Sequence, residues 1–106
     1  MINTVYIAMY TPENAAVECL GAYTTRKNAE DVLVKHHREL CKRIYTQALT
    51  HITQENYQGI CKKELDYYNT ISDYDLFIEM EHNRYLTIVT APIDEFIDIA
   101  VYYEYD

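Results

Sequence analysis

Tryptophan is absent from the sequence, and glycine and proline occur only twice each among the 106 residues. With two isolated glycines, the chain cannot form the glycine-rich loop that wraps a phosphate group, so nucleotide-binding motifs of that kind are excluded. The scarcity of both residues favours long helices and strands with short connections. A run of about 18 apolar residues is also missing, so the sequence predicts no segment that spans a membrane.

Cysteine pairing has no support either. The three cysteines, Cys19, Cys41 and Cys61, are odd in number and widely spaced, and no CxxC motif occurs. This usage is typical of reduced thiols in the cytoplasm. The first residues also lack the basic region of a signal peptide. We therefore expect a single cytoplasmic domain that covers residues 1–106.

Positive charge is scarce in the C-terminal part of the chain. Residues 66–106 hold ten acidic residues and one basic residue, Arg84, whereas residues 1–65 hold seven acidic and eight basic residues. The net charge of −8 therefore comes almost entirely from the C-terminal part. Because binding to a phosphate backbone requires lysine or arginine, direct binding to nucleic acid or to an anionic membrane is disfavoured. A basic protein is the partner that this charge favours.

Two strands and a long helix are predicted for the first half of the chain. Residues 5–10 and 16–23 are rich in β-branched and aromatic side chains and are closely connected, so we expect an antiparallel hairpin. Thr24 or Thr25 is a suitable N-cap for a helix over residues 26–52. The apolar stripe of this helix keeps i, i+3, i+4 spacing and consists of Ala29, Val32, Leu33, His36, Leu40, Ile44, Ala48, Leu49 and Ile52.

A second helix and two further strands are predicted for the second half. Thr53 could cap the helix. In residues 73–82, DYDLFIEMEH, apolar and polar side chains alternate, which is typical of a half-buried strand. Asn83–Arg84 then reads as a tight turn to a partner strand over residues 85–91. Residues 92–106 suit a helical turn followed by a final strand.

These elements predict an α+β fold. Their order is β-β-α-α-β-β with a C-terminal turn and strand. Two hairpins would join in one antiparallel sheet, with the helices packed on one face.

The opening unit is similar to a known group of proteins. Its hairpin and threonine-capped helix with a KxAE pattern resemble the start of many small accessory proteins of bacteriophages and their hosts, and residues 85–95 resemble the strand that often closes such chains. The matching residues of the opening unit are Val5, Tyr6, Ile7, Tyr23, Thr24, Thr25, Lys27, Ala29 and Glu30. The resemblance carries over no catalytic motif and no cofactor. It implies a non-enzymatic inhibitor of the anti-defence type, which binds and blocks a host factor.

The acidic side chains of the C-terminal part form the main candidate binding site. On a strand, Asp75, Glu79 and Glu81 would share one face at a spacing of about 6.6 Å, and this line of charge could imitate nucleic acid toward a basic protein. The expected partner is a host nuclease, a restriction or CRISPR component, a toxin or a transcription factor. An acidic face can also serve solubility alone. The predicted partner-binding residues are Asp75, Phe77, Glu79, Glu81, Asp94, Glu95, Asp98, Tyr103 and Glu104.

Three side chains on the long helix offer an alternative of another class. His36, His37 and Cys41 lie within about one turn, and imidazole and thiolate groups bind zinc, so they could serve a small metal-binding protein or a metal-dependent enzyme. No second ligand pair occurs, and we therefore expect no metal and no cofactor. A ligand-binding module that uses the twelve tyrosines is a third possibility, for which the sequence has no specific motif.

Self-association is a separate possibility, because a long helix with a surplus apolar stripe is often completed by a second copy of the chain. Its candidate residues for a homodimer are Leu40, Ile44, Tyr45, Ala48 and Leu49.

Overall fold

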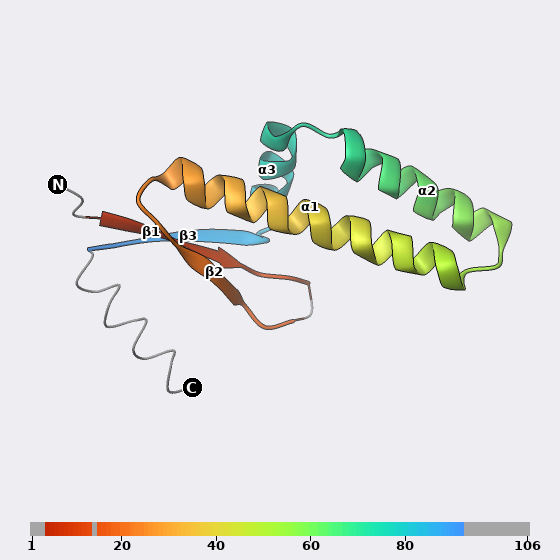
Figure 1. Ribbon diagram of the computed structural model, residues 1–106, viewed down its shortest axis with the longest axis horizontal. Coiled ribbons are helices and arrows are strands. Elements are labelled where there is room, and N and C mark those ends of the chain that lie inside the picture. Colours follow the sequence, from red (N-terminus) through yellow and green to blue (C-terminus); the bar gives the residue numbers. More distant parts are fainter. Residues whose placement is uncertain (1–3, 14, 93–106) are drawn as a thin grey trace.

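A computed structural model describes residues 4–13 and 15–92, which form a three-stranded sheet and three helices (Figure 1). The predicted α+β class is confirmed, as are the first hairpin and the first two helices. One element differs, because residues 73–82 form a helix rather than a strand. The order is β1 (Thr4–Tyr10), β2 (Glu18–Tyr23), α1 (Arg26–His51), α2 (Glu55–Thr70), α3 (Asp73–His82) and β3 (Leu86–Pro92).

Strand β1 lies at the centre of the sheet, whose order is β2-β1-β3. It pairs antiparallel with β2, so that Tyr6 faces Tyr23, and antiparallel with β3, so that Tyr6 faces Thr90. The predicted second hairpin is therefore wrong. Because its expected first strand is helical, β3 pairs with the strand at the start of the chain instead.

The β1–β2 pairing contains an irregularity at Gly21. The register shifts between Ala8 and Met9, and Gly21 opposite Ala8 has a φ of +136°, which only glycine adopts without strain. A Cβ atom at this position would lie 3.1 Å from the Tyr23 hydroxyl oxygen. The backbone conformation therefore favours glycine here, and any larger residue would also need the Tyr23 ring to shift slightly.

Helix α1 covers one face of the sheet with its first half. The Thr25 hydroxyl caps it by accepting a hydrogen bond from the Asn28 backbone N–H at 3.2 Å. Its buried residues are Ala29, Leu33, Val34 and His37. The stripe is therefore rotated slightly from the predicted one, because His37 rather than His36 is buried.

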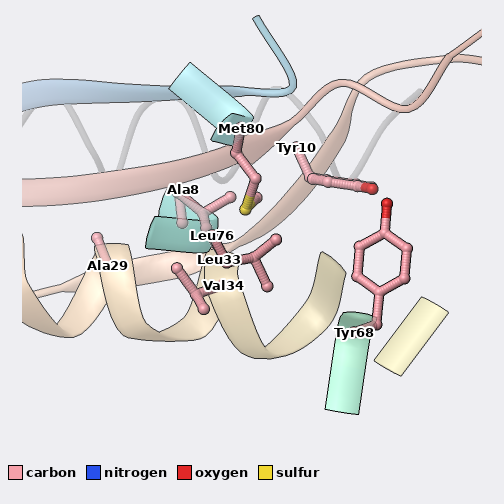
Figure 2. Packing of buried hydrophobic residues seen from close by; sticks show 8 residues of the cluster. All are labelled: Ala8, Tyr10, Ala29, Leu33, Val34, Tyr68, Leu76 and Met80. Carbon is pink, nitrogen blue, oxygen red and sulfur yellow. The ribbon is translucent and has the colours of Figure 1, made fainter. Parts of the chain in front are cut away.

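The main core lies between this face of the sheet and the helices (Figure 2). All three helices and β1 contribute to it. Its buried residues are Ala8, Tyr10, Ala29, Leu33, Val34, Tyr68, Leu76 and Met80. A smaller cluster of Val5, Ile7 and Ala91 lies on the opposite face, because successive side chains of a strand alternate between faces.

Helix α3 replaces the predicted strand because a helical period places its apolar residues better. The Ser72 hydroxyl accepts a hydrogen bond from the Asp75 backbone N–H at 3.1 Å, which caps the helix. Leu76 and Met80, one turn apart, are fully buried, whereas 73% of Tyr74 is exposed. Asp73 and Asp75 lie in the first turn, where negative charge stabilises the helix dipole.

Helix α1 is much longer than the sheet that supports it. Its 26 residues span about 39 Å, whereas a seven-residue strand spans about 23 Å. The distal part of α1 and most of α2 therefore extend past the strands, at the right of Figure 1. We call residues 44–65 the overhanging hairpin. No helix in the described part of the chain is both long and apolar enough to cross a membrane.

Candidate functional site

Four of the nine predicted binding residues lie in α3, and the helix separates them. Asp75 and Glu81 are exposed, whereas Phe77 is half-buried against the main core and Glu79 faces a pocket. The predicted row of carboxylates on one strand face is therefore wrong, because a helix turns successive residues by about 100°. The other five lie outside the described residues: Asp94, Glu95, Asp98, Tyr103 and Glu104.

The solvent-facing side of α3 carries a mixed apolar and acidic surface. Ile78 is 44% exposed, and its neighbours one turn away in either direction are Tyr74, Asp75, Glu81 and His82. We call these five residues the α3 outer face. No lysine or arginine occurs in the α3 sequence. This side therefore presents an isoleucine and a tyrosine beside two carboxylates.

The three candidate metal ligands on α1 do not meet. His37 faces the core, and its ring lies 3.7–3.8 Å from the Cys41 sulfur. His36 instead reaches strand β2, where its Nε2 atom lies 3.4 Å from the Glu18 Oε2 atom. Within residues 4–13 and 15–92, no three side chains of His, Cys, Asp or Glu are grouped as metal ligands. This geometry does not support a metal site shared by His36, His37 and Cys41, which was the alternative considered from the sequence.

A pocket of about 360 Å³ opens where α1 leaves the sheet. We call it the tyrosine pocket. It collects side chains from β1, the β1–β2 connection, α1, α2, α3 and the segment before β3. Its polar and aromatic lining consists of Tyr10, Glu13, His37, Cys41, Tyr45, Tyr68, Glu79 and Tyr85.

The end of α3 positions one wall of this pocket. The Tyr85 backbone N–H donates to the Met80 carbonyl at 2.9 Å, and the Arg84 N–H donates to the Glu81 carbonyl at 3.2 Å. Arg84 has a φ of 61°, so these bonds form a Schellman motif with arginine in the left-handed position. The motif reverses the chain and places Tyr85 in the pocket lining.

His37 lies at the centre of the aromatic lining. Its Nδ1 atom is hydrogen-bonded to the Tyr10 hydroxyl at 2.6 Å. The His37 ring centroid lies 5.2 Å from that of Tyr85 and 6.0 Å from that of Tyr68. Tyr68 also stacks on Tyr45, with the centroids 6.1 Å apart. In Figure 2 the hydroxyl groups of Tyr10 and Tyr68 point toward one another.

Burial keeps the groups around His37 uncharged. Desolvation lowers the pKa of His37, because the buried imidazolium would lose its hydration. Desolvation also raises the pKa of the Cys41 thiol and of the Tyr10, Tyr45, Tyr68 and Tyr85 hydroxyls. At neutral pH the pocket therefore contains a neutral imidazole, a protonated thiol and protonated phenols.

Glu79 is held at the pocket by a neighbouring tyrosine. The Tyr67 hydroxyl donates a hydrogen bond to Glu79 Oε2, and this bond is the main reason that the pKa of Tyr67 rises to about 12. The carboxylate therefore faces the pocket with one oxygen already bound by the protein.

The Cys41–His37 pair does not have the arrangement of an activated nucleophile. A nucleophilic cysteine needs a lowered thiol pKa and a base that can accept its proton. Here burial raises the pKa of the Cys41 thiol instead of lowering it, although His37 Nε2 lies 3.7 Å from the sulfur. The geometry supports binding through aromatic rings, hydroxyls and carboxylates better than covalent chemistry.

Most of the tyrosine pocket could not be found in the sequence. Its four tyrosines lie at positions 10, 45, 68 and 85, with no common motif. The i, i+4 pair His37 and Cys41 was the only local signal. Comparison of the chain with protein-family models, curated proteins and solved structures gives no match.

Proposed function

We propose that this protein is a non-enzymatic binding protein whose α3 outer face docks on a basic surface of another protein. The observation that carries the proposal is the exposure of Tyr74 and Ile78 on consecutive turns of a helix that has four carboxylates and no lysine or arginine. Water-exposed apolar side chains of this size favour burial in a contact.

The composition of the α3 outer face is typical of a protein interface. Interfaces place aromatic and large apolar side chains at the centre and charged side chains at the rim. Ile78 and Tyr74 would form the centre, and Asp75 and Glu81 the rim. Carboxylates at a rim accelerate encounter with a basic surface and make the association sensitive to salt.

The nature of the partner follows from charge and from the sequence resemblance. A protein with a net charge of −8 favours a partner that presents lysine and arginine. The resemblance to bacteriophage accessory proteins makes a basic host protein our proposed partner, which the bound protein would block. Imitation of nucleic acid is not part of the proposal for α3, because its carboxylates do not form a row.

The first experiment isolates the apolar centre. A partner captured from host lysate would be identified by mass spectrometry, purified, and titrated against the wild type and the double variant Tyr74→Ala/Ile78→Ala. We expect the variant to bind about 30-fold or more weakly, since central interface residues each contribute roughly 1–2 kcal/mol or more. The matched control is Tyr57→Ala/Ile60→Ala, because these residues are 56% and 55% exposed on α2.

A second experiment tests the charged rim. Asp75→Lys/Glu81→Lys should slow association and weaken its salt dependence, whereas Glu39→Lys/Glu55→Lys changes two exposed acids elsewhere by the same charge. Circular dichroism checks that each variant is folded. Wild-type affinity for Tyr74→Ala/Ile78→Ala, or equal losses in test and control variants, would refute the proposed surface.

A further inference from the structure

The tyrosine pocket lies on a different side of α3 from the α3 outer face. Docking of the outer face on a partner would not use the side chains that line the pocket. Its volume of about 360 Å³ is near the lower end of the range for small-molecule sites, roughly 300–1,000 Å³. A pocket of this volume accepts a small ligand or one small group of a larger ligand. The chemistry of the lining residues selects which group binds.

The charges of the lining favour a cation. Glu13 and Glu79 are its acidic residues, and none of the described residues that line the pocket is lysine or arginine. His37 stays neutral, because its burial lowers the pKa of the imidazole. An anionic ligand would therefore meet carboxylates without a compensating positive group, whereas a cation would be attracted.

The aromatic rings narrow the class further. Four tyrosines line the pocket, and two of them, Tyr45 and Tyr68, lie with their ring planes only 20° apart. Electron-rich ring faces attract ammonium and guanidinium groups and tolerate their attached methyl groups. A hard metal ion would instead need several oxygen ligands, and within the described residues no group of three His, Cys, Asp or Glu is placed to hold one.

We propose that the tyrosine pocket binds an organic cation, an ammonium or guanidinium group, between its tyrosine rings and the carboxylates of Glu79 and Glu13. Glu79, which is half-buried, supplies one carboxylate of the pocket wall, and Tyr67 orients it by donating to Oε2. Two sources share this chemistry. The cation could be a free small amine, or it could be a lysine or arginine side chain of a bound protein.

The test uses probes of matched shape and different charge. Choline would be titrated against 3,3-dimethyl-1-butanol, its neutral isostere, and methylguanidinium against N-methylurea, which has the same planar shape without the charge. Binding would be followed by NMR, through the shifts of the probe methyl groups near aromatic rings and of protein amides. We expect choline to bind at least about tenfold more tightly than the neutral alcohol, because the cation–ring attraction adds to the carboxylate attraction.

Variants link the binding to this pocket. Glu79→Gln keeps the shape of the side chain and removes its charge, and Glu13→Gln does the same at an exposed position that does not support the core. Each should weaken choline about threefold to tenfold. Glu81→Gln is the matched control, because it changes the same helix by the same charge on the α3 outer face. If Glu79→Gln does not fold, Glu13→Gln still tests the site.

Peptides distinguish the two sources. Acetylated and amidated tripeptides with a central lysine or arginine are compared with the same peptide with central glutamine. Tighter binding of the cationic peptides than of choline supports a receptor for a protein side chain, and the reverse supports a small-amine site. Equal binding of charged and neutral probes, or no loss in both Glu13→Gln and Glu79→Gln, would overturn the proposal. These outcomes are independent of docking through the α3 outer face.

Discussion

The two halves of helix α1 have the same kind of sequence but different surroundings. The half that lies on the sheet buries Ala29, Leu33, Val34 and His37. Among the described residues, the half that belongs to the overhanging hairpin packs mainly against α2, and there 51% of Ile44 is exposed. An apolar stripe thus continues along the whole helix, but only its first half contains fully buried residues.

This difference shows that an apolar stripe on a helix predicts full burial only where another layer of structure, such as the sheet, packs against it. A two-helix hairpin has one internal contact line, so part of each apolar face stays wet. Stability should therefore be distributed unevenly, with high opening free energies on the sheet and low ones in residues 44–65. The uneven support also creates the tyrosine pocket, which lies where α1 passes the end of β1.

The largest expected effect comes from the covered half. Leu33→Ala should lower the free energy of unfolding by about 2–5 kcal/mol, because the leucine is fully buried and the space left behind cannot collapse completely. Ile44→Ala, its counterpart in the overhanging hairpin, should cost about 1 kcal/mol or less. Urea denaturation followed by circular dichroism measures both values. Similar losses would contradict the proposed contrast between the two halves.

A smaller effect is expected at the joint where Arg38, in the middle of α1, contacts the end of α2 and the start of α3. The Arg38 guanidinium donates to the carbonyls of Tyr68 at 2.6 Å and Ile71 at 2.8 Å, and to Asp73 Oδ1 at 2.8 Å. Arg38→Gln should destabilise the fold by about 1–3 kcal/mol, because carbonyls at the end of α2 lose charged donors.

The matched change at the same joint is Asp73→Asn. The Asp73 side chain is 78% exposed, so this variant should cost less than about 1 kcal/mol. If Asp73→Asn lowers the free energy of unfolding as much as Arg38→Gln does, the ion pair rather than the carbonyl contacts holds the end of α2 in place.

The pH dependence of stability tests His37, which is the last buried residue of the covered half. Its folded-state pKa is lowered below the ordinary value of 6.5, so the unfolded chain binds the proton first as the pH falls. The contribution of His37 to the free energy of unfolding should be fully present above about pH 6.5. Below that pH it should decrease by at most about 1.4 kcal/mol per pH unit. His37→Phe should flatten this decrease, whereas exposed His51→Gln should not. An unchanged slope in His37→Phe would assign the effect to other groups.

The smallest expected effect is a gain in the overhanging hairpin. Gly59 lies inside α2, and a Cβ atom there would meet nothing within 4 Å. Gly59→Ala should therefore stabilise α2 by about 0.5–1 kcal/mol through its higher helix propensity. Hydrogen exchange should slow in residues 55–65 and stay unchanged in β1. Uniform slowing would show that the hairpin and the sheet open together.

The parts of the fold with one clear period were predictable from sequence. The predicted helix over residues 26–52 is observed as Arg26–His51, and the N-cap at Thr25 is observed as well. The β1–β2 hairpin followed from β-branched and aromatic residues on either side of a short connection. In these segments local propensity and tertiary packing agree, so the sequence alone was sufficient.

Residues 73–82 carry two periods at once, and the prediction chose the wrong one. Tyr74, Leu76, Ile78 and Met80 alternate as in a strand, but Leu76 and Met80 are also one helical turn apart. The deciding signal was Ser72 with acidic residues in the first turn, which is the pattern of a helix start. Tertiary packing then selected the helix, since it buries Leu76 and Met80 together and leaves Tyr74 and Ile78 outside.

The candidate sites were predictable only in part for the same reason. Asp75 and Glu81 remain on one exposed surface because they flank Ile78 at three residues on either side. Phe77 and Glu79 leave that surface when the strand becomes a helix. The tyrosine pocket depends on packing among six segments, and no local rule relates Tyr10 to Tyr85.

The central position of β1 sets an order of events during synthesis. β1 can pair with β2 as soon as both have left the ribosome, and α1 and α2 can pack because they are neighbours in sequence. The other edge of β1 stays open until β3 emerges, since Tyr6 pairs with both Tyr23 and Thr90. We expect a chain paused after α3 to carry a finished helical hairpin beside an unfinished sheet, whose free edge can join a strand of another molecule.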